Sequence, residues 1–332
     1  MRPGCDGARL GATVAAAAMA VLAGALAGSP AAAAQDWPAR PIRMIVPAAA
    51  GGSTDIGARQ IARLMSVALG QPVVVDNKGG AGGRLGAQEA ARAPADGYTL
   101  IYGNSITHAL LPATSRSVSY DPLKNFAPAG GVFWYSTLLV CNPSLPFNDL
   151  AGYIGYAKAH PGKLNIATAG LGSGNHFSSE LLSQMAGIQV THIPYKGNAP
   201  AVQDVMGGAA DCIQMGEAKS YLDGGRLKAL ATTGKARDPR FPNVRTMDEQ
   251  GLKGFDATWW QAVFAPGGTP ADVMAKLTAA VRKATEDPST RTTMFDAGFV
   301  PDFVPPAQLE KRIQGDMAKF RKIAAETGIE LE

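Results

Sequence analysis

Cysteine is scarce in this sequence, and its spacing excludes two classes of small stabilised domain. The 332 residues include only three cysteines, Cys5, Cys141 and Cys212. None stands in a Cys-x-x-Cys pair, so neither a zinc finger nor a disulfide-dense scaffold is indicated. Cys141 and Cys212 each fall in an apolar stretch typical of a strand. Two buried thiols are the favoured interpretation, because a disulfide would require these two strands to be neighbours.

Charge is also sparse and is not gathered in blocks. Charged residues make up 17% of the chain, and the formal net charge is +4. Without a basic block, neither a nucleic acid nor an anionic membrane is expected as a partner. His108 and His192 are single histidines with no cluster of His, Cys or carboxylate ligands at metal spacing beside them. We therefore expect no metal site.

After the start of the chain, no apolar run is long enough to span a bilayer. Arg2 and Arg9 precede a stretch without charge from Gly11 to Ala34, which ends in four alanines at residues 31–34. A basic start, an apolar middle and small final residues are typical of a secretory signal peptide. A membrane anchor is the alternative, but alanine drives insertion weakly and no basic stop-transfer flank follows. We expect residues 1–34 to be cleaved near Ala34, leaving a soluble exported protein.

The segment Ile45–Met65, "IVPAAAGGSTDIGARQIARLM", predicts a strand, a glycine turn and a helix. Such a turn presents backbone N–H groups and the positive end of a helix dipole, which suits an anion. A phosphate-binding Walker loop would need Gly-Lys-Ser/Thr, whereas Ser53 follows Gly51-Gly52 directly. Nucleotide hydrolysis is therefore disfavoured. The alternative is that Ser53 or a neighbouring side chain only caps the helix.

The same strand, loop and helix pattern recurs along the chain. An alternation of strands with helices of about ten residues indicates an α/β fold with mainly parallel sheets covered by helices. Ligands of such sheets bind at the carboxyl ends of the strands, where these loops lie. The recurring loops follow the predicted strands at Val73–Asp76, at residues ending in Gly103-Asn104, at Leu164–Thr168 and at Thr191–Pro194.

The pattern predicts two domains with a ligand cleft between them. We assign residues 35–136 and 257–332 to domain 1, and residues 137–256 to domain 2, inserted through two crossovers. Trp134-Tyr135 and Trp259-Trp260 fall at these crossovers. Packing in the core or hinge is favoured for them over stacking on a ligand.

Two enzyme motifs are present only in incomplete form. Gly80-Ala81-Gly82 with Gly86 resembles a dinucleotide fingerprint, but its third glycine comes one residue late and the next strand ends without a ribose-binding acid. We expect no cofactor. Ser173 and His176 could indicate a secreted serine hydrolase. Glycines flank Ser173 directly, unlike a Gly-x-Ser-x-Gly elbow, so a helix cap that offers its hydroxyl to an anion is the favoured role.

Taken together, the ordered motifs of nearly the whole chain after residue 34 resemble the Bug-type, or tripartite tricarboxylate transporter, substrate-binding receptors. The resemblance implies a two-domain periplasmic binding protein that closes on a small carboxylate and delivers it to a membrane permease, without catalysis and as a monomer. A ligand-presenting signalling receptor and the serine hydrolase remain alternatives. The motifs are "WPARPIRMIVPAAAGGSTDIGAR", "VVVDNKGGAGGRLGAQEAARAPADGYTLIYG", "THALLP", "YDPLKNFAP", "GSGNHFSSELL", "THIPYKGNAPAVQDVMGGAADC", "GGRLKALATTG" and "GFDATWWQAVFAPGGTP".

The resemblance also implies which residues bind the ligand, mostly through loop hydroxyls and backbone N–H groups. From domain 1 it implies Ala49, Ala50, Ser53, Asp55, Asn104, Ser105 and Thr107. From domain 2 it implies Ser173, Gly174, Asn175, His176, Lys196, Gly197, Asn198, Ala199 and Asp204.

Two stretches depart from the family pattern. Ala48 stands where family members often carry an aromatic residue, and the stretch Gln214–Gly225 differs, with Glu217 and Lys219 in it. We expect these departures to enlarge or recharge the far end of the pocket.

Overall fold

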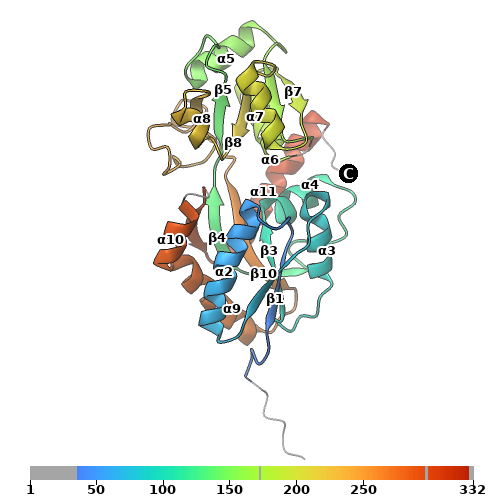
Figure 1. Ribbon diagram of the computed structural model, residues 1–332. Helices are drawn as coiled ribbons and strands as arrows, with labels where there is room; N and C mark the ends of the chain where they lie inside the picture. The colour runs from blue at the N-terminus through green and yellow to red at the C-terminus, as the bar shows by residue number, and fades with distance from the viewer. Residues whose placement is uncertain (1–35, 172, 296–297, 329–332) are drawn as a thin grey trace, which may run out of the picture. The chain divides into compact units, whose positions relative to one another are not determined.

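A computed structural model describes residues 36–171, 173–295 and 298–328 (Figure 1). The predicted signal peptide, residues 1–34, lies outside the described residues. By its internal contacts the chain divides into Met1–Ala39 and Arg40–Glu332. All the helices and strands described below belong to the second of these units.

Six strands from both ends of this unit form the first sheet, in the order β11-β4-β10-β3-β1-β2. Strand β1 is an apolar run of the kind that lies inside a sheet covered on both faces. Four of its five residues, all but Arg43, are buried. The strands are β1 (Ile42–Val46), β2 (Val73–Asn77), β3 (Thr99–Asn104), β4 (Phe126–Tyr135), β10 (Trp259–Pro266) and β11 (Val300–Val304).

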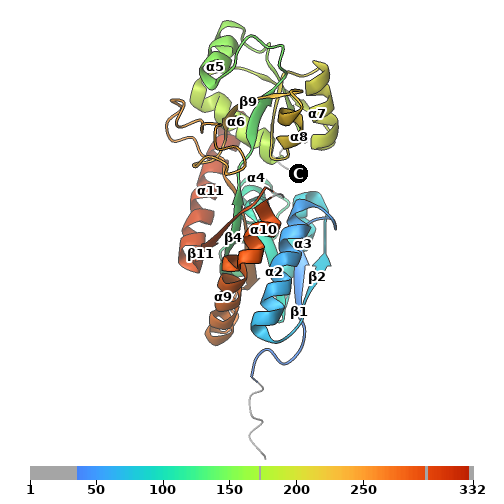
Figure 2. The same ribbon diagram turned by 60° about the vertical axis from the view of Figure 1, so that its left-hand side comes forward.

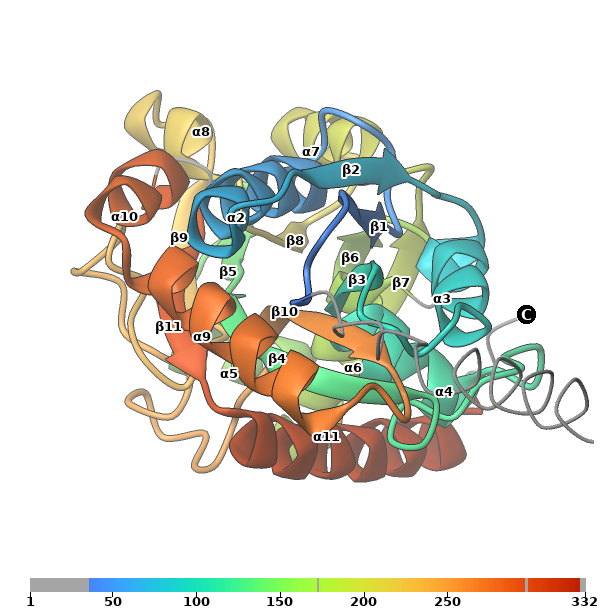
Figure 3. The same ribbon diagram turned by 90° about the horizontal axis from the view of Figure 1, so that it is seen from below.

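Helices cover both faces of the first sheet (Figure 3). α2, α9 and α10 pack together on one face, while α3, the π-helical turn η2, α4 and α11 lie on the other. None of the helices among the described residues is long and apolar enough to cross a bilayer. The helices are α2 (Ser53–Leu69), η1 (Ala81–Gly83), α3 (Arg84–Ala91), η2 (Ile106–Leu110), α4 (Leu111–Thr114), α9 (Ala271–Glu286), α10 (Pro288–Phe295) and α11 (Pro306–Thr327).

Five strands form the second sheet, in the order β7-β6-β8-β5-β9. α5 and α6 bury one face of it, and α7 and α8 bury the other (Figure 2). The strands are β5 (Leu138–Cys141), β6 (Asn165–Thr168), β7 (Thr191–Pro194), β8 (Cys212–Met215) and β9 (Lys228–Thr232). The helices are α5 (Leu150–Ala159), α6 (Gly174–Ala186), α7 (Asn198–Gly207) and α8 (Lys219–Asp223).

The predicted α/β class is confirmed, but both sheets are mixed rather than mainly parallel. Four of the nine strand pairings among the described residues are parallel and five are antiparallel. The strand–helix–strand units β1 to β3 and β6 to β8 give the parallel pairs, as expected. β5 and β10 enter their sheets directly from the other sheet. Each of these two strands therefore runs opposite to its two neighbours in the sheet, and both of its pairings are antiparallel.

Cys141 and Cys212 form a disulfide, which corrects the favoured interpretation of two free thiols. The two residues lie directly opposite each other in the antiparallel pair β5 and β8. The sequence could not show that β5 and β8 are neighbouring strands, because the two cysteines are 71 residues apart in the chain.

Helix α11 connects the packing of the two sheets. It contacts β4 and η2 beside the first sheet and α6 beside the second. Phe320 of α11 stacks on Trp259 with ring centroids 6.0 Å apart. The same ring meets Phe177 of α6 edge to face at 5.9 Å. Trp259 is thus a packing residue, as predicted.

His108 makes folding sensitive to acid. Its ring is fully buried and stacks on Phe264 at 3.9 Å between centroids. Burial lowers the pKa of His108 from 6.5 to about 3. Because the folded pKa lies below the unfolded one, the stability from neutral His108 is present above pH 6.5 and is lost as the pH falls toward 3.

We predict that His108 lowers the free energy of unfolding by about 2 kcal/mol between pH 7 and pH 5. Urea denaturation at both pH values measures this loss. The His108→Gln variant cannot take up the proton, so its loss over the same range should be smaller by that amount. An equal loss in both proteins would show that other groups set the acid sensitivity.

Candidate functional site

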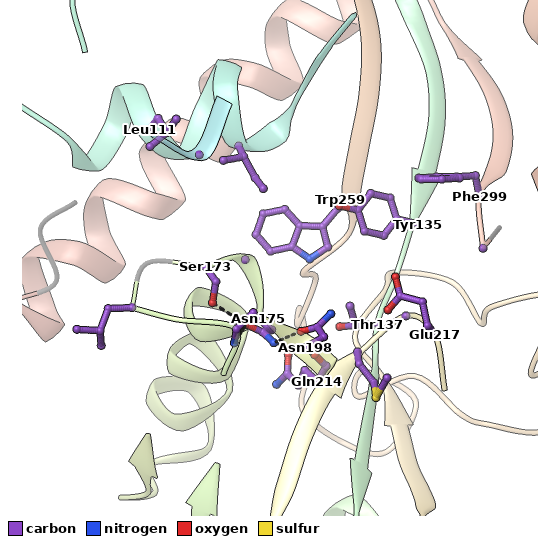
Figure 4. A pocket seen from close by; sticks show the side chains of 18 of the residues that line it. Leu111, Tyr135, Thr137, Ser173, Asn175, Asn198, Gln214, Glu217, Trp259 and Phe299 are labelled. Atoms are coloured by element: carbon purple, nitrogen blue, oxygen red, sulfur yellow. Dashed lines mark hydrogen bonds between the residues drawn. The ribbon is translucent and has the colours of Figure 1, made fainter. Parts of the chain in front are cut away.

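A cavity of about 570 Å³ opens at the carboxyl ends of the parallel strands, between loops of the two sheets (Figure 4). The wall from the first sheet is largely apolar and includes Ile106, Leu111, Trp259 and Phe299. The wall from the second sheet supplies most of the polar groups, among them Ser173, Asn175, Asn198 and Gln214. The cavity therefore suits a small molecule with an apolar body and a polar end.

The first turn of α6 faces this cavity without a capping side chain. Ser173 occupies the N-cap position in an extended conformation, but its hydroxyl makes no capping hydrogen bond. The hydroxyl points instead at the Gly170 carbonyl and the Asn175 Oδ1 atom, at 2.7 and 2.6 Å. The backbone N–H groups of the first turn are thus not used by a cap and can donate to an anion.

Asn175 joins three segments beside the second sheet: the loop after β6, the start of α7 and strand β8. Its Oδ1 atom accepts from the Ala169 N–H at 3.1 Å. Its Nδ2 atom donates to Asn198 Oδ1 and to the Gln214 carbonyl, each at 3.2 Å. Asn198 is the first residue of α7, which likewise has no capping side chain. Asn175 therefore holds the N-termini of α6 and α7 at the same cavity.

Gly174 allows the cavity wall to close tightly. A Cβ atom at this position would lie 2.9 Å from the Trp259 ring, closer than carbon atoms approach in proteins. Only glycine lets the start of α6 rest against the indole face. Trp259 thus lines the cavity in addition to packing in the core, a role that the sequence analysis did not favour.

Gln214 places an unpaired amide in the cavity wall. The residue is only 1% exposed, yet neither Nε2 nor Oε1 has a hydrogen-bond partner within the described ranges. A buried amide without partners is costly, because it loses its hydrogen bonds to water. A ligand that accepts from Nε2 or donates to Oε1 would remove that cost.

Two charged residues complete the lining. Arg240 is largely neutralised, because its guanidinium donates to Asp238 at 2.7 Å and to the Gly216 carbonyl at 3.1 Å. Glu217 is exposed, in the stretch that departs from the family pattern. Burial, with a further contribution from the Glu217 carboxylate, raises the pKa of the Tyr135 hydroxyl. The charge of Glu217 therefore acts on the cavity.

Four predicted ligand residues line the cavity, namely Ser173, Gly174, Asn175 and Asn198. Ala49, Ala50 and Lys196 are exposed in loops and Ala199 is exposed in the first turn of α7, but none of the four is among the described lining residues. Gly197, also outside that lining, has a φ of 109°, which suits glycine at the N-cap of α7. For Ser53 the structure describes only the backbone, at the start of α2.

The other predicted residues make hydrogen bonds within the protein. Asp55 accepts from Arg59 at 2.9 Å and from the Gly51 N–H at 2.8 Å. Although burial opposes the charge, these bonds lower the pKa of the Asp55 carboxyl. Asp204 accepts from the Tyr195 hydroxyl at 2.7 Å. Both residues support loops that lead to the cavity.

The loop after β3 is held in the same way. Asn104 Oδ1 accepts from the backbone N–H groups of Ile106 and Thr107, each at 3.0 Å. Thr107 Oγ1 also contacts His108 Nδ1 at 2.9 Å. Ser105 is 1% exposed and its hydroxyl accepts from the Trp260 N–H at 3.4 Å.

His176, Glu180 and His192 form a cluster that the sequence analysis missed. The Glu180 carboxylate lies 3.7 Å from His176 Nε2 and 3.1 Å from His192 Nδ1. The ring nitrogens and the carboxylate oxygen that could bind a metal ion all lie within 4.8 Å of one another. A tetrahedral zinc ion would hold such atoms about 3.3 Å apart. A hydrogen bond between Glu180 and His192, with the His176 ring nearby, therefore explains the cluster, which ties α6 to β7.

Comparisons with known proteins find similar chains. A family model described as "Tripartite tricarboxylate transporter family receptor" matches residues 57–329. Protein BugT of Bordetella pertussis is 37% identical over 306 residues, which cover 90% of this chain and 93% of that protein.

Solved structures of similar proteins include two with bound acids. One, of an R. palustris protein with adipate, is 33% identical with a TM-score of 0.75, and the match covers 89% of this chain and 99% of the other. MatC from Rhodopseudomonas palustris with bound malate is 35% identical with a TM-score of 0.71, covering 86% of this chain and 99% of the other.

Proposed function

Because the chain belongs to the tripartite tricarboxylate transporter receptor family, we propose that it is a periplasmic receptor that captures a small carboxylate in the cavity between its sheets. The observation that carries this proposal is the meeting of two uncapped helix N-termini, those of α6 and α7, at one cavity. Each terminus offers N–H donors and a positive dipole end to a carboxylate.

The energy of these contacts suits reversible capture. A micromolar dissociation constant corresponds to about −8 kcal/mol. A few hydrogen bonds to a charged group, at about 1.5 to 3 kcal/mol each, can supply this after the costs of association. The Ser173 hydroxyl is directed at Gly170 and Asn175 rather than at a histidine nitrogen, which argues against the serine hydrolase alternative.

Binding of carboxylates is tested with the purified chain lacking residues 1–34. A thermal-shift screen of mono-, di- and tricarboxylates, followed by calorimetry, should find an acid that binds with about micromolar affinity. The uncharged amide of the same acid is the control and should bind far more weakly. Failure of every carboxylate to bind, or equal binding of acid and amide, would contradict the proposal.

We further propose that residues 35–136 with 257–332, and residues 137–256, act as two domains that close on the ligand. Strands β1 to β4, β10 and β11 fall in the first set and β5 to β9 in the second, in agreement with this division. On closure, the exposed segments with Ala49, Ala50, Lys196 and Ala199 would complete the site.

Saturation with the best acid from the screen is expected to reduce the radius of gyration measured by small-angle scattering. A hinge closure shortens the distance between the domains, whereas binding in a rigid pocket leaves it unchanged. Tryptophan emission should change too, because Trp259 lines the cavity. The radius of gyration distinguishes closure from binding in a rigid pocket, since ligand contact alone can alter tryptophan emission. An unchanged radius at saturation would exclude closure.

The location and partner of the receptor form the last part of the proposal. We propose export through the segment of residues 1–34, cleavage near Ala34, and delivery of the ligand by a monomer to a membrane permease of the tripartite type. Mass spectrometry of the periplasmic fraction should find a chain that begins near Gln35. A chain that retains Met1, or that stays in the membrane, would contradict cleavage and export.

A further inference from the structure

The side of the cavity away from α6 carries a negative charge. Glu217 lines the cavity, and Figure 4 shows its carboxylate across the cavity from Ser173. Its effect on Tyr135 places the charge within electrostatic reach of another lining residue. A carboxylate in the wall is unexpected where a ligand with several carboxylates is to bind, since like charges repel.

The cations nearest to Glu217 along the chain and in the cavity wall are engaged elsewhere. Lys219 pairs with Asp223 at 2.9 Å. Arg240 pairs with Asp238 at 2.7 Å. Among the residues that the structure describes, no hydrogen bond or ion pair compensates the Glu217 carboxylate. Its charge is therefore available to a ligand.

The opposite side of the cavity has the reverse electrostatic character. It presents the N-termini of α6 and α7, and Asn175 fixes both in place. Gln214, whose buried amide is unpartnered, lies beside Asn198 in the close view (Figure 4). Donors gather at this side and a carboxylate stands at the other, so the two sides attract opposite charges.

We infer that the ligand is a zwitterion, with a carboxylate at the helix N-termini and a cationic nitrogen that faces Glu217. This inference rests on the proposed binding of a carboxylate at the helix N-termini. A dicarboxylate such as adipate would direct its second charge toward Glu217, whereas an amino carboxylate of the same length would place its ammonium group there. Glu217 thus selects ligands by the charge of the group remote from the helices.

Three acids of equal chain length test this assignment: an ω-amino carboxylate, the dicarboxylate and the unsubstituted monocarboxylate. We would titrate series of four, five and six carbons into the chain lacking residues 1–34. We expect the amino carboxylate to bind at least about tenfold more tightly than the dicarboxylate of its length. In Glu217→Gln this preference should fall at least about tenfold, because the variant keeps the shape and removes the charge.

Glu310→Gln is the matched control, since Glu310 is exposed on α11 and outside the described cavity lining. It should leave the preference unchanged. Melting curves verify that both variants are folded. If dicarboxylates bind as tightly as amino carboxylates, or if Glu217→Gln keeps the parent's preference, the inference is overturned while carboxylate capture stands. If no acid of any series binds to the parent or to Glu217→Gln, carboxylate capture itself fails and the inference fails with it.

Discussion

Replacing Ser173 with aspartate is expected to weaken binding of the best carboxylate at least a hundredfold, or about 2.7 kcal/mol. Ser173 is the N-cap residue of α6 and lines the cavity. An aspartate there can turn toward the first-turn N–H groups and occupy the donors that we assign to the ligand. Its charge would also repel the ligand carboxylate at close range.

The stability of the Ser173→Asp variant should hardly change. The variant loses the hydroxyl contacts with Gly170 and Asn175, about 1 kcal/mol, and gains a cap of similar value that the serine does not provide. Calorimetric titration and melting curves measure the two effects separately.

Ser173→Asn and Ser173→Ala are the matched controls. Asparagine has nearly the size and capping ability of aspartate without its charge, so its loss of affinity should be much smaller. Alanine removes the hydroxyl contacts with Gly170 and Asn175 and leaves the backbone donors in place, so it should cost about 1 kcal/mol of stability and change the affinity little. If Ser173→Asp binds within a few-fold of the parent, the start of α6 does not contact the carboxylate.

Reduction of the disulfide between Cys141 and Cys212 is expected to lower the free energy of unfolding by about 4 kcal/mol. The bond joins residues 71 apart in sequence, so it restricts a long loop of the unfolded chain. Closing a loop of this length in the unfolded state is the source of the expected value. The effect should be largest on the second sheet, where both cysteines lie.

Urea denaturation of the oxidised and reduced forms of one protein measures this effect without changing the sequence. The Cys141→Ala/Cys212→Ala double variant gives the same comparison without a reductant, with an added loss because both side chains are fully buried. Both the parent and the double variant are treated with the reductant. The free energy of unfolding of the double variant should not change. Equal stability of the oxidised and reduced parent would mean that the strands alone hold this pairing.

The polar wall of the cavity was partly predictable from the sequence. The segment "GLGSGNH" indicated a helix start with Ser173 at its N-cap, and the structure begins α6 at Gly174. The bonds of Asn175 to Asn198 and Gln214 were not predictable, because they join the start of α6 to the start of α7 and to strand β8, which are separate in the sequence. Trp259 was recognised as a packing residue, but its contact with the cavity depends on how close α6 approaches.

The sequence by itself determined the local units of this protein. Apolar runs indicated the strands, the spacing of apolar residues and the capping residues indicated the helices, and glycines indicated the turns between them. Gly187, for example, ends α6 with a φ of 61°, a left-handed conformation that glycine adopts readily. Tertiary structure alone decided the direction of β5 and β10, the bond between Cys141 and Cys212, and the hydrogen bonds that join Asn175 to Asn198 and Gln214. Caps and periodicity act over a few neighbouring residues, whereas strand order and cavity walls depend on which distant segments pack together, and each segment alone is compatible with several partners.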